Sequence, residues 1–251
     1  MMSRATKTSG KALVTGSAAR IGRSIAQALH GRGLDIMIHC NSNQDGAGEL
    51  EAELNRERTG SACVVSADLT RADELDRLCA ACREWCGGRL DLLVNNASRF
   101  YPTAVGETQG YQWDDLLDSN LRGPYFLSQG LLPALRPAGG AIVNIVDVHA
   151  ERPMKGHAVY CIAKAGLRMM TLALARELGP EVRVNGVSPG AILWPEAETD
   201  ERAREDILAR TALKRTGEPD DIASAVAWLA LDAPYVTGQI VAVDGGRLLN
   251  I

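Results

Sequence analysis

The chain has 251 residues, a formal charge of −4 at pH 7 and 46% apolar residues. That length can bury one large core, and an acidic chain without a run of Lys or Arg argues against a nucleic-acid partner. The basic residues within 1–11 precede no apolar signal core, and no stretch approaches the roughly 18 apolar residues of a membrane helix. We therefore expect a cytoplasmic protein with neither a nucleic-acid nor a membrane partner.

Short apolar runs alternate with amphipathic stretches along the chain. The expected strands are residues 11–16, 35–40, 61–68, 91–97, 140–147, 182–190 and 239–246. The expected helices are residues 20–33, 46–58, 70–85, 110–136, 156–178 and 217–231. The strands are continuously apolar, which suits a parallel sheet covered on both faces. The pattern predicts an α/β fold over residues 1–251: a single-domain, doubly wound, Rossmann-like parallel sheet with helices on both faces and a flexible N-terminus at 1–10.

Half of the six cysteines, Cys79, Cys82 and Cys86, fall in the stretch CAACREWC (79–86) at the end of the expected helix 70–85. Their spacing places them on one helix face near Leu75 and Leu78, which favours a buried apolar surface. No second Cys or His pair follows at ligand spacing, so we expect no metal site and no disulfide. Thr70, with Asp73 three places later, is expected to begin this helix as a near capping box.

A glycine turn follows the first strand in the segment VTGSAARIG, residues 14–22. Gly16 allows a tight turn, and Gly22 lets the following helix approach the sheet and a dinucleotide pyrophosphate. Many helices begin after glycine, so the segment gains specificity only from its place in the first βαβ unit. Arg20 replaces a glycine common in such loops and supplies a cation beside the phosphates.

The second strand ends without the acidic residue that would bind the ribose hydroxyls of NAD. Neutral donors occupy this place: His39, Asn41, Ser42 and Asn43. Together with Arg20 they favour a 2′-phosphate, so we expect NADPH (NADP) as cofactor. The alternative is that the loop faces solvent without binding a ligand.

Several motifs follow one another at fixed places: ADL (67–69), NNA (95–97), YCIAKAG (160–166), SPG (188–190) and VTGQIVAVDGG (236–246). With the glycine turn they resemble the short-chain dehydrogenase/reductase family over essentially the whole chain. The expected cofactor-binding residues are Gly16, Arg20, Ile21, Gly22, His39, Asn41, Ser42, Asp68, Leu69, Asn96, Ala97, Ser98, Tyr160, Lys164, Pro189 and Gly190.

Tyr160 and Lys164 lie one helical turn apart, so their side chains are expected to meet. A neighbouring ammonium would lower the pKa of Tyr160 from about 10, so that it donates a proton near neutral pH. The resemblance implies that Lys164 also holds the nicotinamide ribose and that Asn120 orders a water beside it. For an isolated Tyr-x-x-x-Lys pattern, an ordinary surface pair is the alternative.

Asp147 stands where most of the family has a serine that bonds a substrate carbonyl. A carboxylate would repel a developing alkoxide, whereas it suits a substrate with ring nitrogens. The alternative is a hydrogen-bonding role at the strand end. Phe100, in NNASRFYPT (95–103), could stack a planar heterocycle against the nicotinamide or plug a local core.

These two residues narrow the resemblance to the pteridine reductases, which share the Arg-x-Gly end of the glycine turn, the NNAS-x-FYPT segment and the aspartate. The bacterial dihydromonapterin reductases look like close relatives. The resemblance implies that Phe100 and the nicotinamide sandwich a pterin, with Arg20 and Ser98 lining the same site. Pteridine reductases often carry an arginine for the 2′-phosphate where this chain has CNSN (40–43).

Residues 191–210 are expected to form a substrate loop, with an apolar lid at its start and a solvated helix in its charged remainder. Trp194 in this lid could equally cap the core. The expected substrate-binding residues are Arg20, Ser98, Phe100, Asp147, Tyr160, Leu193 and Trp194, and the expected catalytic residues are Asn120, Asp147, Tyr160 and Lys164. A homotetramer built through helices 110–136 and 156–178 is implied by the resemblance.

The expected function is NADPH-dependent reduction of dihydropterins, extending to oxidised pterin and to folates, by hydride transfer with proton donation through Tyr160 and Asp147. One alternative is a reductase of another carbonyl or imine, for example of 3-oxoacyl type. A second alternative is a protein that binds NADPH without turnover, although such a sensor would need no proton-donating residues.

Overall fold

The structure, a computed structural model, describes residues 10–192 and 201–250, without the side chains of 201–204. Its centre is a seven-stranded parallel sheet in the order β3-β2-β1-β4-β5-β6-β7. The strands are β1 (Lys11–Val14), β2 (Asp35–Cys40), β3 (Ala62–Ser66), β4 (Leu92–Asn95), β5 (Ala141–Ile145), β6 (Arg183–Pro189) and β7 (Ile240–Val243). The strand order reverses between β1 and β4, which is where a doubly wound sheet binds ligands.

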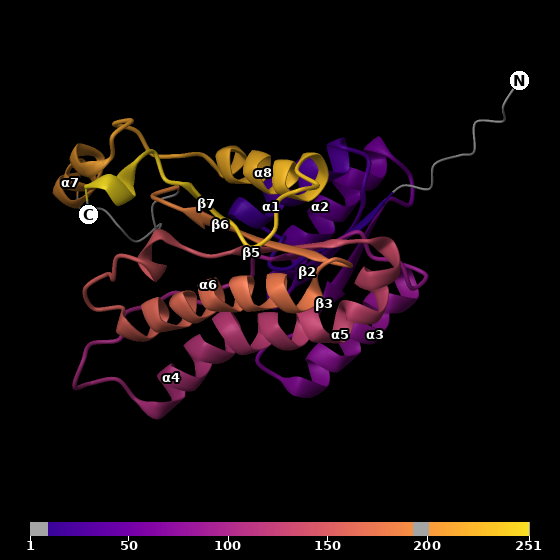
Figure 1. Cartoon of the computed structure of the whole chain (residues 1–251), viewed down its shortest axis with the longest axis horizontal. Coiled ribbons are helices and arrows are strands. Elements are labelled where there is room, and N and C mark those ends of the chain that lie inside the picture. Colours follow the sequence, from indigo (N-terminus) through magenta and orange to yellow (C-terminus); the bar gives the residue numbers. More distant parts are fainter. Residues whose placement is uncertain (1–9, 193–200, 251) are drawn as a thin grey trace, which may run out of the picture.

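Helices cover both faces of this sheet (Figure 1). The α-helices are α1 (Arg20–Gly31), α2 (Gln44–Glu57), α3 (Ala72–Trp85), α4 (Gly110–Leu117), α5 (Gly123–Ala138), α6 (Ala158–Leu178), α7 (Glu201–Arg210) and α8 (Pro219–Ala227). Short turns of other helix types are η1 (Asp118–Arg122), η2 (Val148–Ala150), η3 (Trp228–Asp232) and η4 (Arg247–Leu249). The predicted doubly wound fold is confirmed.

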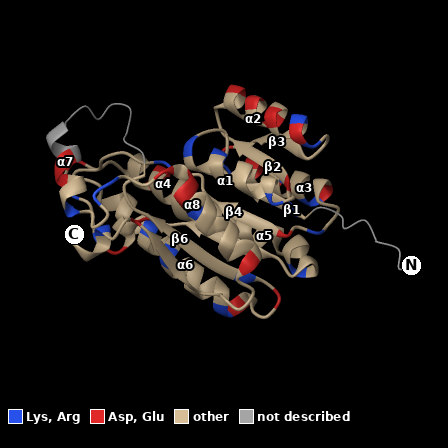
Figure 2. Cartoon of the chain, turned by 90° about the horizontal axis from the view of Figure 1, so that it is seen from above, with Lys and Arg blue, Asp and Glu red and all other residues tan. Residues whose placement is uncertain are grey.

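Two apolar clusters, one on each face of the sheet, explain why the strands are continuously apolar. In β1, Val14 joins the cluster under α1, α2 and α8, whereas its neighbour Leu13 joins the cluster under α3, α5 and α6. Successive strand residues point to opposite faces, so both must be apolar in a sheet covered on both sides. Lys, Arg, Asp and Glu lie mainly on the outer helices, such as α2, and the strands are largely uncharged (Figure 2).

The expected helix 110–136 is interrupted where the sequence showed no obvious break. It comprises α4, the π-helical turn η1 and α5. Pro124 stands at the first turn of α5 and has no N–H to donate, and the N–H of Gly123 instead reaches the Asp118 carbonyl across the wider turn. Similarly, the expected helix 217–231 ends in a π-helical turn, η3.

Helix α3 begins differently from the prediction. Its N-cap is Arg71, whose side chain makes no cap bond, and the Thr70 hydroxyl and backbone N–H both donate to the Asp68 carboxylate. The predicted capping box of Thr70 and Asp73 is therefore wrong, because Asp68 takes the Thr70 hydroxyl.

The cysteines of this region are buried, as predicted. Cys79 and Cys82 lie on the inner face of α3, and Cys86 follows the helix in the same apolar cluster. All six cysteines are free thiols. The Cys79 sulfur lies so close to Gly130 of α5 that a Cβ there would stand 2.6 Å from it. The small residue on α5 thus lets the two helices pack closely.

Helix α6 is long and apolar enough to cross a membrane by length and composition alone. The expectation that no stretch would meet that criterion is wrong for 158–178. Half of its apolar window is buried inside the fold, α6 packs against β6, and its Tyr160 and Lys164 are both buried. A core helix passes the same test, and we describe α6 as a core helix of the α/β fold.

Candidate active site

A cleft of about 1070 Å³ opens at the carboxyl edge of the sheet. The predicted site residues that line it are Gly16, Arg20, Ile21, Gly22, His39, Asn41, Ser42, Asp68, Leu69, Asn96, Ala97, Ser98, Phe100, Asp147, Tyr160, Lys164, Pro189 and Gly190. Asn120 is buried behind this wall. Leu193, Trp194 and the rest of 193–200 lie outside the described residues, as does the N-terminal segment 1–9. The other predicted residues are thus brought together in one place.

The glycine turn after β1 is as tight as its sequence predicts. Gly16 has a φ of +63°, and a Cβ on Gly22 would stand 2.2 Å from the Gly16 carbonyl oxygen. Arg20 also lies in the left-handed region, with a φ of +52°, which explains why glycine is common at its position. Its exposed side chain reaches the cleft.

The start of α1 fits a phosphate group. Its N-cap residue Ala19 provides no side-chain acceptor, and the first turn contains no acidic residue. The first N–H groups of the helix, with the positive end of its dipole, therefore face the cleft without a competing carboxylate. These residues fit the phosphates of a nicotinamide cofactor.

His39 differs from the role that its position suggested. Its Nδ1 accepts from the Gly16 N–H at 3.1 Å, and its Nε2 lies 3.0 Å from the Ala67 carbonyl oxygen, to which it donates as the neutral ring. Burial lowers the pKa of His39 to about 4. The expectation that His39 donates to a 2′-phosphate is therefore corrected: both ring nitrogens already hold the glycine turn against the residue that follows β3. Asn41 and Ser42 are exposed and line the cleft, whereas the exposed Asn43 caps α2 by accepting the Gly46 N–H.

Asn96 joins the ends of β1 and β4. Its side-chain amide donates to the carbonyl oxygens of Thr15 and Gly16, at 2.8 and 3.1 Å. In return, the Thr15 hydroxyl accepts the backbone N–H groups of Asn96 and Ala97. These bonds fix the floor of the cleft at the switch point of the sheet.

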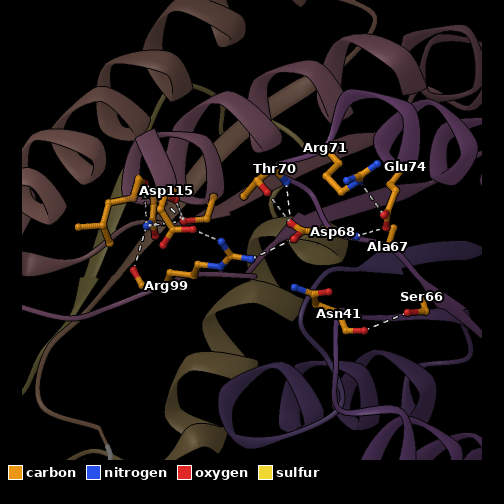
Figure 3. A network of polar contacts seen from close by, with 12 residues as sticks. Asn41, Ser66, Ala67, Asp68, Thr70, Arg71, Glu74, Arg99 and Asp115 are labelled. Carbon is orange, nitrogen blue, oxygen red and sulfur yellow. Dashed lines mark hydrogen bonds and ion pairs between the residues drawn. The ribbon is translucent and has the colours of Figure 1, made fainter. Parts of the chain in front are cut away.

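Arg99 connects two sides of the cleft through a polar network (Figure 3). Its guanidinium bonds Asp68 after β3, at 3.1 Å, and Asp115 on α4. Asp115 also accepts the Tyr101 hydroxyl at 2.9 Å. Partial burial works to raise the pKa of Asp68, but two hydrogen bonds from Thr70 and the Arg99 charge outweigh it, so that pKa is lowered. The network holds the loop that carries Ser98 and Phe100.

Tyr160, Lys164 and Asp147, three of the residues predicted to be catalytic, lie together in the cleft wall. The Tyr160 hydroxyl donates to the Asp147 Oδ2 at 2.8 Å, and the other carboxylate oxygen accepts the His149 backbone N–H at 2.8 Å. The buried Lys164 ammonium donates to the Ile145 carbonyl oxygen at 2.9 Å and lies 5.7 Å from the Tyr160 ring centre. Asp147 is thus bonded to Tyr160 as well as to the strand end.

The electrostatics of Tyr160 differ from the expectation. Burial raises its pKa, and the Asp147 charge and hydrogen bond raise it further, to well above 10. Burial also lowers the pKa of Lys164 to about 8, against the effect of the Asp147 charge, which raises it. The predicted fall in the Tyr160 pKa is therefore wrong in this structure, because Asp147 bonds the hydroxyl directly and the lysine does not.

Phe100 lies at the wall of the cleft and is half-exposed. Its ring stacks on His157 with centroids 4.6 Å apart and meets the Tyr160 ring edge-on at 4.8 Å. This exposure excludes the alternative of a local core plug. An aromatic face beside Tyr160 suits a planar ligand.

Asn120 acts on the cleft through Ser98. Its amide oxygen accepts the Ser98 hydroxyl at 2.6 Å, and its amide nitrogen donates to the carbonyl oxygens of Arg99 and Leu116. The π-helical turn η1 places the side chain in this position. The side chain thus holds the loop 96–103, a contact that the predicted water-ordering role did not include.

Sequence reasoning missed several residues of the cleft wall: Ala19, Thr70, Arg99, Ser119, His149, Met154, Ile207 and Arg247. Arg99 falls inside the NNASRFYPT segment, so its motif was a usable signal. Arg247 follows directly after the terminal VDGG motif, beyond the end of β7. Ile207 comes from α7, which agrees with the helix predicted in the charged remainder of the substrate loop 191–210.

Similarity to known proteins covers nearly the whole chain. A family model described as enoyl-(acyl carrier protein) reductase matches residues 16–247. The chain is 34% identical to pteridine reductase 1 of Leishmania tarentolae, over 97% of this chain and 98% of that protein. It is 35% identical to the 3-oxoacyl-[acyl-carrier-protein] reductase FabG of Staphylococcus epidermidis, over 95% and 98%. It is 32% identical to the uncharacterized oxidoreductase YmfI of Bacillus subtilis, over 94% and 97%.

The fold, the cleft and these matches define an oxidoreductase that works with a nicotinamide cofactor. The chain belongs to the short-chain dehydrogenase/reductase family. Its identities to the pteridine reductase and to the 3-oxoacyl reductase are nearly equal. Overall sequence identity therefore does not distinguish between the two substrate classes, and the side chains that line the cleft determine which substrate fits.

Proposed function

We propose that this chain is an NADPH-dependent reductase of pterins that converts dihydropterins to tetrahydropterins and extends to oxidised pterin and folates. The observation that carries the proposal is the 2.8 Å hydrogen bond between Tyr160 and Asp147 in the wall of the cleft. A carboxylate can accept the N–H groups of a pterin, whereas it would repel the alkoxide that forms from a ketone. The similarity to a pteridine reductase supports the same substrate class.

NADPH, when bound, supplies the hydride. Arg20, Asn41 and Ser42 lie along the cleft where its phosphates would be held. The choice of NADPH over NADH rests on these residues and on the missing acidic side chain after β2. Phe100 would orient the planar ring of the substrate by stacking.

The proton comes from Tyr160 in this proposal. Its raised pKa keeps the hydroxyl protonated at neutral pH, so it can donate to a nitrogen that gains negative charge. Asp147 orients the hydroxyl and can accept a ring N–H. Lys164, with a pKa of about 8, is cationic at neutral pH and stabilises the tyrosine when its proton leaves.

The proposal extends to the whole molecule. We place the activity in the cytoplasm, in one domain over residues 1–251 that uses 191–210 as its substrate loop. Ile207 of α7 lines the cleft, which supports a role for this segment. Exposed aromatic side chains on α4 and α5 support a homotetramer assembled through these helices.

A 3-oxoacyl reductase is the second candidate, because the similarity to such reductases is as high as that to the pteridine reductase. It predicts turnover of a 3-oxoacyl thioester and no strict need for a carboxyl at position 147. Asp147→Ser would then improve ketone turnover, since it removes the charge beside the alkoxide.

The deciding assay follows NADPH absorbance with 7,8-dihydrobiopterin and, separately, with a 3-oxoacyl thioester. Wild type is compared with Asp147→Ser and Tyr160→Phe. We expect wild-type turnover of the dihydropterin and a loss of at least a hundredfold in both variants, the usual scale of general-acid catalysis. NADPH binding without oxidation by either substrate would contradict both enzymatic proposals and favour a cofactor-binding protein.

A further inference from the structure

Arg247 is a cation in the cleft wall that the proposed reduction does not use. It lies in the C-terminal turn η4 and is half-buried. Its Nε and Nη1 atoms are buried and have no hydrogen-bond partner among the residues that the structure describes. Buried guanidinium nitrogens nearly always have partners, because leaving them unpaired costs free energy. This side chain therefore lacks an acceptor that a ligand in the cleft could supply.

The carboxylates whose charges act on Arg247 are those of Asp147, Asp206 and Asp244, and all three are already engaged. Asp147 accepts from Tyr160 and the His149 N–H, and Asp206 pairs with Arg210 at 3.1 Å. Asp244 accepts the backbone N–H groups of residues 246 and 248, at 2.8 and 2.7 Å. Among the described residues, none of these acids bonds the Arg247 guanidinium.

The backbone holds Arg247 in place. Gly245 and Gly246 have φ values of +62° and +78°, and Asp244 caps the turn that they form. Asn250 then donates to the Arg210 carbonyl oxygen at the end of α7, so η4 and α7 lie side by side (Figure 1). Arg247 is thus presented by a fixed turn rather than by a loose chain end.

We propose that Arg247 binds an oxyanion on the substrate, a carboxylate or a phosphate that projects from the reduced ring toward η4. The inference rests on the proposed pterin reduction. Asp147 and Arg247 would then bind different groups of one substrate: the Asp147 carboxylate accepts ring N–H groups, and the Arg247 guanidinium binds the anionic substituent. The two ligand sources are a glutamyl tail, as in folates, and a phosphate ester on a pterin side chain.

The test measures dissociation constants by calorimetry on the full chain loaded with NADP⁺. The probes are 7,8-dihydrobiopterin, which is neutral, 7,8-dihydrofolate, which carries carboxylates, and 7,8-dihydroneopterin monophosphate. Wild type is compared with Arg247→Leu and Arg247→Lys. Arg210→Leu, which removes a nearby cation already paired with Asp206, is the matched control.

We expect Arg247→Leu to weaken binding of at least one anionic probe tenfold or more, the scale of a charge-assisted hydrogen bond, and to change dihydrobiopterin less than twofold. Arg247→Lys should keep part of the affinity, because the charge remains without the planar fork. The probe that loses affinity identifies the oxyanion as carboxylate or phosphate.

Other results would overturn the inference in recognisable ways. Equal loss for all three probes would mean that Arg247 only supports the turn or Asp147, and loss of NADP⁺ affinity would make it a cofactor contact. Unchanged affinities would exclude contact with the substrate. Failure of dihydrobiopterin to bind wild type would instead sink the pterin proposal itself, because that probe does not depend on Arg247.

Discussion

Lys164 titrates in the range where the enzyme is expected to work. Its pKa is lowered by burial to about 8, and the Asp147 charge opposes that shift. Below that pH the ammonium is present, and above it the side chain is neutral and cannot stabilise an ionising Tyr160. We expect kcat/KM to fall as the pH rises through about 8.

The Asp147 charge provides the control for this pH dependence. Asp147→Asn removes a charge that favours the ammonium, so the pKa of Lys164 should fall and the alkaline loss should begin at lower pH. The pH dependence of NADPH binding measures this even where turnover is abolished. If the alkaline loss stays at the same pH in the variant, or moves to higher pH, the group that titrates is not Lys164.

Arg20 combines a backbone cost with a ligand contact, and two substitutions separate them. Arg20→Gly and Arg20→Ala both remove the cation, so NADPH affinity should fall to a similar extent. Because the residue has a φ of +52°, the glycine variant should be the more stable of the two by about 1 kcal/mol. Urea unfolding and NADPH titration of both variants test this. Equal stabilities would mean that the backbone relaxes when the arginine is absent.

Single residues also show where sequence reasoning stops. The motifs placed Tyr160 and Lys164 correctly, because a spacing of four on a helix has one geometric meaning. The direction of the Tyr160 pKa was wrong, since it depends on which neighbour bonds the hydroxyl. The hydrogen-bond partners of His39, Gly16 and Ala67, lie far from it in sequence, so no local pattern predicts them. The burial of the Arg247 guanidinium nitrogens among the described residues likewise depends on how distant segments pack.

At the scale of elements, the turn between β1 and α1 depends on the absence of one methyl group. A Cβ on Gly22 would stand 2.2 Å from the Gly16 carbonyl oxygen and 2.5 Å from the Asn96 amide nitrogen. Gly22→Ala must push the helix from the sheet, and we expect a loss of about 1–3 kcal/mol in the free energy of unfolding with weaker NADPH binding.

Gly48 gives the matched control for that substitution. It lies within α2, and a Cβ there would meet no atom within 4 Å. Gly48→Ala should stabilise the protein by about 0.5–1 kcal/mol through helix propensity and leave NADPH affinity unchanged. Similar effects of the two substitutions would show that close packing at Gly22 is not the cause.

The Arg99 network joins the end of β3 to α4 and is expected to contribute to stability. Arg99→Met leaves the partly buried Asp68 and Asp115 without their shared cation, and we expect a loss of about 1–2 kcal/mol at neutral pH. Arg71→Met removes an exposed cation from Asp73 and Glu74 and should leave the free energy of unfolding almost unchanged, because water screens such surface pairs.

Unfolding measured at low pH distinguishes the loss of this charge interaction from the loss of packing by the arginine side chain. The pKa of Asp68 is lowered in the folded protein, so its stabilisation is present above the unfolded pKa of about 3.9 and disappears as the pH falls through the folded value. The stability difference between wild type and Arg99→Met should therefore narrow in acid. A difference that persists would assign the loss to packing of the arginine stem.

The elements themselves were largely predictable. Seven continuously apolar strands and the amphipathic stretches between them were sufficient to predict the sheet and the helices on its two faces. A strand that is apolar throughout must be buried on both faces, and an amphipathic helix buries one face against the sheet. The π-helical turn η1 was not predicted, although Pro124, which has no N–H to donate, follows it in the first turn of α5. It is also the turn that presents Asn120 to Ser98.

The whole molecule leaves one helical face uncovered. Helices α4, α5 and α6 lie on the same side of the sheet (Figure 1), and large apolar side chains on them are exposed: Tyr111, Trp113, Tyr125, Phe126, Ile162 and Met169. A concentration of exposed aromatic residues is typical of a protein interface. The proposed homotetramer would bury this face.

Phe126→Glu tests that assembly. Phe126 is 43% exposed and packs edge-on against Tyr125, so a carboxylate there would be buried without a partner in an interface. We expect wild type to sediment as a tetramer and the variant as dimers or monomers. Val105→Glu, on the exposed loop before α4, should leave the assembly intact. A monomeric wild type would refute the homotetramer and leave the helical face without this explanation. A tetrameric Phe126→Glu variant would instead place the interface elsewhere.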